Sequence, residues 1–291
     1  MKMNIIRLFC GVAMLYLPTG LANAPKDWIA IPQHQLAYLQ TEQGTAVLLL
    51  ADEFTPHNTA RFRQLIAQGF YNDLTFYRVI DQFVLQAGLM EGESHPRALT
   101  KVAPVAAEFS WPLPKDDSYL KVQAPDLLAA ETGFRRGFAV GRDGTHEWLI
   151  HCPNVVNLAR GNDADSATSD FAIMQGQAPR HLDRNMSIVA RVIWGQPVLN
   201  SVKRGAMADG GIIENPAQRS KIIRMSLGSE LPTSQQLPLQ ILASNSAIMQ
   251  QKLQAARQRS GDFYVYAGNG QVDICYQQIP VRLAPTPDKT K

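Results

Sequence analysis

The chain has 291 residues, of which 45% are hydrophobic and 18% charged, and this composition is typical of a globular protein with one large domain or one domain and an appendage. Its formal net charge of +3 argues against binding to nucleic acid or to a membrane surface by bulk electrostatics. No internal repeat is visible in the sequence.

Residues 1–22 have the pattern of a secretory signal peptide. Lys2 and Arg7 precede an apolar run that ends at Pro18 and is too short to cross a bilayer. We expect cleavage after Ala22, export to the periplasm or secretion, and no stable membrane insertion afterwards. Cleavage would lower the 28 basic residues to 26 against 25 acidic ones, a net charge near +1. An uncleaved N-terminal anchor is the alternative.

Two cysteines, Cys152 and Cys275, remain beyond the expected signal peptide. In an oxidising compartment they could form a disulfide, which would add on the order of 4 kcal/mol in the chain-entropy model because the closed loop is long. Two isolated buried thiols are the other interpretation. Nothing in the sequence places the two side chains together.

The first half of the chain predicts a β-hairpin over residues 35–51, then a helix, then two short strands within 75–88. Thr55 can cap the helix, Pro56 suits its first turn, and Gly69 closes it. The strands within 75–88 are rich in aromatic and β-branched residues.

Two polar residues interrupt the apolar pattern of those strands. Arg78 lies inside the first strand and Gln86 lies near the end of the second. From the pattern alone, an arginine on a strand is most often an outward-facing surface charge.

Residues 89–151 have prolines at 96, 104, 112 and 114, a charged run and little periodicity, and we interpret them as an elaborated surface excursion rather than a separate domain. His146, Glu147 and His151 lack the spacing of a helical metal site, so we assign them surface or structural roles and expect no metal.

The second half of the chain again predicts short elements. We expect strands at 155–159, 171–174, 187–193 and 222–227, a short helix at 197–202, and a C-terminal appendage with a helix at 244–259 followed by a hairpin of 263–266 and 272–276. Several short strands with two well-placed helices favour a mainly β fold, either a barrel or a sandwich.

Three blocks in this order resemble the cyclophilins. Residues 69–88 (GFYNDLTFYRVIDQFVLQAG) are similar to the central signature of that family, 165–174 (DSATSDFAIM) to its serine- and threonine-rich segment before aromatic residues, and 181–202 (HLDRNMSIVARVIWGQPVLNSV) to its Leu-Asp turn, strand and final helix. The resemblance gives a cyclophilin-like domain over 33–228, with a long insertion at 89–151, and leaves a C-terminal extension at 229–291.

The resemblance implies a closed eight-stranded antiparallel barrel with two flanking helices, and peptidyl-prolyl cis-trans isomerase activity that needs no cofactor. Unfolded or partly folded proline-containing polypeptides are the implied partners, and we expect a monomer. Carried over by position, Arg78 is the catalytic arginine and Gln86 holds the peptide carbonyl. The implied substrate-binding positions are Phe83, Val84, Ala159, Arg160, Ala172, His181 and Leu182.

This chemistry suits those residue types. Rotation about a peptide C–N bond has a barrier of about 18–20 kcal/mol, because the nitrogen lone pair is delocalised into the carbonyl. A guanidinium held beside an apolar proline pocket can donate to the prolyl nitrogen once the twisted state frees that lone pair, so it binds the transition state better than the ground state.

Several positions depart from the family pattern. Ala172 stands where a second phenylalanine is usual, His181 where an aromatic is common, Met186 where histidine or tyrosine is common, and Asp170 where glutamine is usual. We therefore expect weaker proline binding, and weak binding of cyclosporin, unless Met174 or the insertion refills the space. The alternative function is a non-catalytic chaperone or assembly module that binds polypeptide on the same barrel.

Overall fold

The computed structural model describes residues 27–94, 102–115 and 118–285, and the expected signal peptide lies outside these ranges. The strands are β1 Trp28–Ala30, β2 Leu36–Thr41, β3 Gly44–Leu50, β4 Thr75–Ile80, β5 Val84–Gly88, β6 Trp111–Pro112, β7 Tyr119–Gln123, β8 Glu131–Arg135, β9 Phe138–Arg142, β10 His146–Leu149, β11 Val155–Leu158, β12 Phe171–Met174, β13 Ile188–Trp194, β14 Ser220–Leu227, β15 Leu239–Leu242 and β16 Val281–Leu283. The α-helices are α1 Pro56–Ala67, α2 Gln196–Asn200 and α3 Ala247–Gln258, and the short 3₁₀ helices include η2 Arg180–Leu182 and η7 Ile274–Tyr276.

Eight strands close into an antiparallel barrel in the order β11-β12-β5-β4-β14-β2-β3-β13. The mainly β fold with a closed eight-stranded barrel is therefore confirmed. Period-two alternation sets the inside and outside of the wall: on β12, Phe171 and Ile173 point into the barrel core, whereas Ala172 and Met174 join an apolar cluster on its outer face. Helices α1 and α2 are the two expected barrel helices, and α1 packs on β13 and β14.

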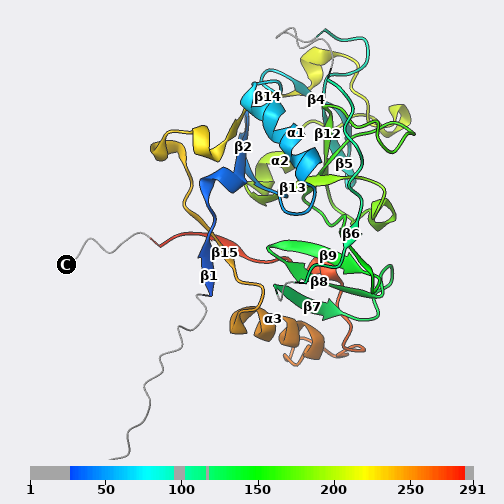
Figure 1. Ribbon diagram of the computed structural model, residues 1–291, viewed down its shortest axis with the longest axis vertical. Coiled ribbons are helices and arrows are strands. Elements are labelled where there is room, and N and C mark those ends of the chain that lie inside the picture. The colour runs from blue at the N-terminus through cyan, green and yellow to red at the C-terminus, as the bar shows by residue number, and fades with distance from the viewer. Residues whose placement is uncertain (1–26, 95–101, 116–117, 286–291) are drawn as a thin grey trace, which may run out of the picture.

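The insertion contains a sheet of its own, which the loose periodicity of this region did not predict. Strands β6-β10-β9-β8-β7 form this five-stranded sheet, which lies beside the barrel and is visible below it in Figure 1. Its strands are short, and the sheet is covered on both faces, so neither length nor simple polar alternation marks them in the sequence. Phe138 and Leu149 pack toward the barrel, and Phe134 and Trp148 pack toward α3.

The predicted C-terminal hairpin is also wrong. Instead of pairing with 272–276, the segment 263–266 is solvent-exposed, with Phe263 at 89% of its full accessibility. Its aromatic residues suggested a strand, but they face no partner that would bury them. The strands of the extension are β15 and β16, which pair with each other, and β15 also pairs with β1. The helix predicted at 244–259 is α3.

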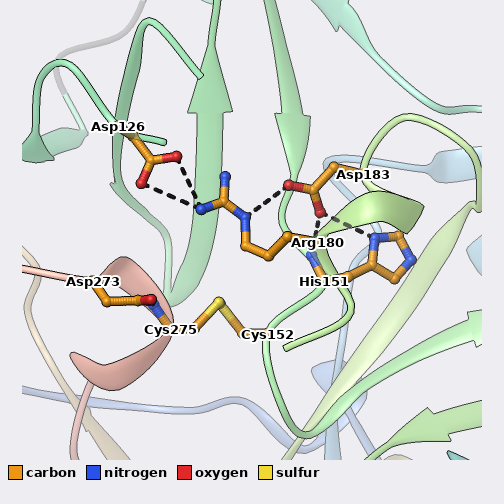
Figure 2. Close-up of a disulfide and its surroundings, with 7 residues drawn as sticks. All are labelled: Asp126, His151, Cys152, Arg180, Asp183, Asp273 and Cys275. Carbon is orange, nitrogen blue, oxygen red and sulfur yellow. Dashed lines mark hydrogen bonds and ion pairs between the residues drawn. A yellow bond between two sulfur atoms is a disulfide. The ribbon is translucent and has the colours of Figure 1, made fainter. Parts of the chain in front are cut away.

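A disulfide joins Cys152, at the end of the insertion, to Cys275 in η7, with 4.9 Å between their Cα atoms. The pairing that the sequence left open is therefore present. Figure 2 shows a buried ion-pair cluster beside it. Arg180 bridges Asp126, 2.9 Å away, and Asp183, also 2.9 Å away. These links fasten the insertion, the extension and the η2 turn of the barrel to one another.

None of the helices within the described ranges is both long enough and apolar enough to cross a membrane.

Candidate active site

A β-bulge in β4 places the polar residues of the candidate site. The pairing of β4 with β5 shifts register between Phe76 and Arg78, so that Arg78 lies opposite Gln86 while Phe76 still points into the barrel core. Tyr77 is the extra residue of the bulge. Bulges re-aim side chains in this way, and here Tyr77 and Arg78 both reach the same glutamine.

A chain of hydrogen bonds runs through these side chains. Arg78 Nη1 donates to Gln86 Oε1 over 3.2 Å. Gln86 Nε2 donates to the Tyr77 hydroxyl over 2.5 Å, and that hydroxyl donates to Asp170 Oδ2 over 2.7 Å. Asp170 Oδ1 also accepts from the backbone N–H of Leu89 over 3.2 Å. Gln86 is thus held at both ends of its amide, with its oxygen toward Arg78.

Burial affects the protonation of Asp170 and Tyr77 in this chain of hydrogen bonds. Desolvation raises the pKa of Asp170, and the hydrogen bond from Tyr77 offsets part of that rise. Desolvation also raises the pKa of Tyr77, and the neighbouring Asp170 charge adds to the rise. Tyr77 therefore stays a phenol at physiological pH and acts as a donor to Asp170.

A glycine turn holds Arg78 from the other side. Arg78 Nε donates to the carbonyl of Gly210 over 3.1 Å, and Val79 N donates to Gly211 O over 2.7 Å. Gly211 has φ of 80°, and a Cβ there would lie 2.4 Å from Ile80 Cγ1 and 2.9 Å from the Val79 oxygen. Glycine is required for the turn to approach β4 this closely.

The apolar half of the site lies on the same outer face. Ala172 is the ladder partner of Gln86, and Met174 is the partner of Val84. Val84 is 3% exposed and Ala172 6% exposed. Both belong, with Met174, to the apolar cluster of the outer face, against which the half-buried Phe83 and Leu182 pack.

That cluster also contains side chains of the inserted sheet, including Phe138 and Leu149. Ala172 thus belongs to an apolar layer that also includes Met174 and side chains of the insertion.

The remaining predicted positions lie around this face. Ala159 N donates to the backbone carbonyl of Asp170 over 2.7 Å, which holds Ala159 beside the polar chain. The Arg160 guanidinium is used locally, since its Nε donates to Asn185 O over 2.9 Å and its Nη1 to Gly161 O over 2.8 Å. His181 is exposed on η2, the turn that carries Leu182.

Two residues near the site were missed by sequence reasoning. Tyr77 had no signal of its own, because an aromatic residue on a strand is typical of core. Asn157 is fully buried, is the ladder partner of Ala172, and leaves Oδ1 without a hydrogen-bond partner. A buried asparagine within the apolar segment 155–159 was the available clue.

No cluster of three or more histidine, cysteine, aspartate or glutamate side chains that could hold a metal ion occurs within the described ranges. Glu147 is instead a buried ion-pair partner of Arg135 and Arg142, 2.7 Å from each. His151 is buried against Asp183, with 3.3 Å between Nδ1 and Oδ1.

The family model described as "Cyclophilin type peptidyl-prolyl cis-trans isomerase/CLD" matches residues 36–227. The chain belongs to this cyclophilin family. It is accordingly a peptidyl-prolyl cis-trans isomerase by family, and the matched range agrees with the region over which the sequence resembles cyclophilins.

Individual relatives support this assignment. A "Probable peptidyl-prolyl cis-trans isomerase" of Brucella abortus (strain 2308) is 24% identical over 228 residues, covering 75% of this chain and 99% of the relative. "Peptidyl-prolyl cis-trans isomerase CYP23" of Arabidopsis thaliana is 23% identical over 220 residues, covering 76% of this chain and 80% of the relative. The crystal structure of cyclophilin AquaCyp293 from Hirschia baltica superposes with a TM-score of 0.69 at 23% identity, covering 93% of this cyclophilin and 98% of that chain, and is similar to it in fold.

Proposed function

We propose that this cyclophilin isomerises X-Pro bonds with Arg78 as the catalytic donor and Gln86 as the group that holds the substrate carbonyl. The observation that carries the proposal is the pairing of these two side chains across β4 and β5, with 3.2 Å between Nη1 and Oε1. The side chains sit on the outer barrel face next to an apolar cluster. A guanidinium and an apolar surface side by side are the two groups that prolyl isomerisation needs.

The mechanism follows from what each group can do. The half-buried Phe83 and Leu182, which pack over the buried Val84, take the pyrrolidine ring out of water. Exclusion of water strengthens each polar contact with the substrate. The guanidinium of Arg78, fixed by Gly210 and Gln86, donates to the prolyl nitrogen when the bond twists and the lone pair localises. No bond to the enzyme forms, and no proton leaves the guanidinium.

We further propose that the substrates are unfolded or partly folded proline-containing segments of exported proteins. The signal-like residues 1–22 support this placement, and so does the disulfide between Cys152 and Cys275, since disulfides persist in oxidising compartments. The site has no dedicated cofactor in this proposal.

A second candidate function is polypeptide binding without useful turnover. Ala172 favours it, because the residue beside Gln86 offers a proline ring far less contact than a phenylalanine would. The two candidates differ in turnover, which can be measured directly.

A protease-coupled assay on an X-Pro peptide tests the choice. The wild-type chain should accelerate the slow cis-to-trans phase, and Arg78→Ala should lose most of that acceleration. Arg224→Ala, an exposed arginine on β14, serves as the matched control and should keep it. Equal rates for the wild type and Arg78→Ala would end the catalytic proposal in favour of binding.

A further inference from the structure

A groove of about 550 Å³ lies between the barrel and the C-terminal extension. Strand β13 and the start of α2 supply one wall, and Lys252 of α3 with residues 278–281 supplies the other. Neither Arg78 nor Gln86 lines it, so it is separate from the candidate active site. Two cations, Arg191 and Lys252, line the groove, and no described residue lining it is acidic.

Arg191 is a half-buried cation with no acidic partner among the described residues. Its Nε and Nη2 atoms are shielded from solvent and have no hydrogen-bond partner in the described structure. Burial lowers the pKa of Arg191 to about 10, and no neighbouring charge contributes. The guanidinium is therefore still protonated at neutral pH. Elsewhere in the fold, buried arginines have acidic partners, as Arg135 has Glu147, because an unpaired buried charge is costly.

A bound water molecule cannot neutralise the charge of Arg191. Arg191 also borders a small cavity of about 20 Å³ next to Cys152 and Cys275, which has room for about one water. That water could accept hydrogen bonds from the inner edge of the guanidinium, but it would leave the charge uncompensated. The open side of Arg191 lines the groove, from which an anion can reach the guanidinium.

The groove offers a second cation and an apolar wall. Lys252 Nζ donates to the Gln278 carbonyl over 2.8 Å, which holds the exposed ammonium at the groove. Trp194, Pro197 and Pro280 provide apolar surface alongside. A small inorganic anion would use the cations alone, whereas an anion with an apolar body would use the whole groove.

We propose that this groove is a binding site for an organic carboxylate, with the carboxylate between Arg191 and Lys252 and its apolar body against Trp194 and the prolines. Arginine matches the geometry of a carboxylate and lysine adds a point charge. The proposal does not depend on the isomerase activity, since neither Arg78 nor Gln86 lines the groove.

Thermal unfolding of the full chain with benzoate as the probe tests the site. Benzoate should raise the unfolding midpoint in a saturable way, as a ligand of the native state does, and benzamide, its neutral counterpart, should not. Lys252→Met should shift the concentration dependence at least tenfold upward, and Arg191→Met should abolish the effect. Lys203→Met, an exposed lysine outside the groove, should behave as the wild type.

Equal shifts with benzamide or with sodium chloride at the same concentration would overturn the proposal, and so would an unchanged benzoate response in Arg191→Met. Without any ligand, Arg191→Met should be at least as stable as the wild type, because it removes an uncompensated charge. If that variant fails to fold, Lys252→Met decides the matter: a benzoate response equal to that of the wild type would contradict the proposed site.

Discussion

Arg78 and Gln86 lie opposite each other on β4 and β5, and the guanidinium donates to the amide oxygen over 3.2 Å. The bulge at Tyr77 makes this possible, because it turns Arg78 to the outer face without removing Phe76 from the core. The geometry of the polar half of the site is thus a property of strand register, and it is supported by residues that would not touch a substrate.

The first prediction concerns Tyr77 as a positioning residue. Tyr77→Phe removes the acceptor of the Gln86 amide, so Gln86 should sample other orientations, and kcat should fall about tenfold with little change in KM, since small misplacements weaken reactive geometry. Steady-state isomerase kinetics check this. Tyr264→Phe, a solvent-exposed control, should have wild-type values. A change confined to KM would argue against a positioning role.

The second prediction concerns Asp170. Because its pKa is raised in the folded state, the native chain keeps that proton to higher pH than the unfolded chain does. The contribution of Asp170 to the free energy of unfolding should therefore fall as pH rises from near its usual value of 3.8 through the raised native value, and stay constant above it.

Urea unfolding of Asp170→Asn and wild type between about pH 3.5 and 7 measures this contribution. The variant should gain stability relative to the wild type as pH increases. Asp262→Asn, at an exposed position, should show no such trend. A difference between variant and wild type that does not vary with pH would contradict the raised pKa.

The third prediction concerns the disulfide. Residues Cys152 and Cys275 are 123 positions apart in sequence, so replacing both by alanine should lower the free energy of unfolding by about 3–4 kcal/mol. Hydrogen exchange should increase first in α3 and the inserted sheet, which share the core beside the disulfide. A reductant should destabilise the wild type and leave the double variant unchanged. If the barrel strands lost protection first, the proposed role of this link would be wrong.

The fourth prediction concerns Ala172. Cyclosporin should bind weakly to the wild type, because the outer face lacks the phenylalanine usual at this position. Ala172→Phe combined with Asn157→Ser, which makes room at the ladder partner, should tighten the complex at least tenfold, as expected for restoring a large apolar contact. Calorimetric titration gives both affinities. A tight complex with the wild type would show that other residues already complete the pocket.

Local sequence patterns predicted much of the barrel. The aromatic and β-branched residues of 75–88 predicted β4 and β5, and the cap at Thr55 with Pro56 predicted α1. In contrast, the inserted sheet was missed, because Phe138 and Trp148 belong to short strands that are buried on both faces. Such strands depend on partners distant in sequence.

The candidate site was also predictable only in part. The motif resemblance indicated Arg78 and Gln86, and the structure brings them together. Tyr77 was missed because its role comes from a bulge, and register shifts leave no trace in composition. The pairing of Cys152 with Cys275 depends on how the insertion meets the extension, which no local pattern encodes.

The most direct measurement of the central claim is exchange NMR on a proline peptide with the wild type, Arg78→Lys and Arg224→Ala. The wild type and Arg224→Ala should speed cis-trans exchange of the bound peptide. Arg78→Lys should bind the peptide with similar affinity but exchange it about 10²-fold more slowly, since an ammonium lacks the fixed planar donor. Exchange at the wild-type rate in Arg78→Lys, with the peptide bound, would contradict the assignment of Arg78 as the catalytic donor.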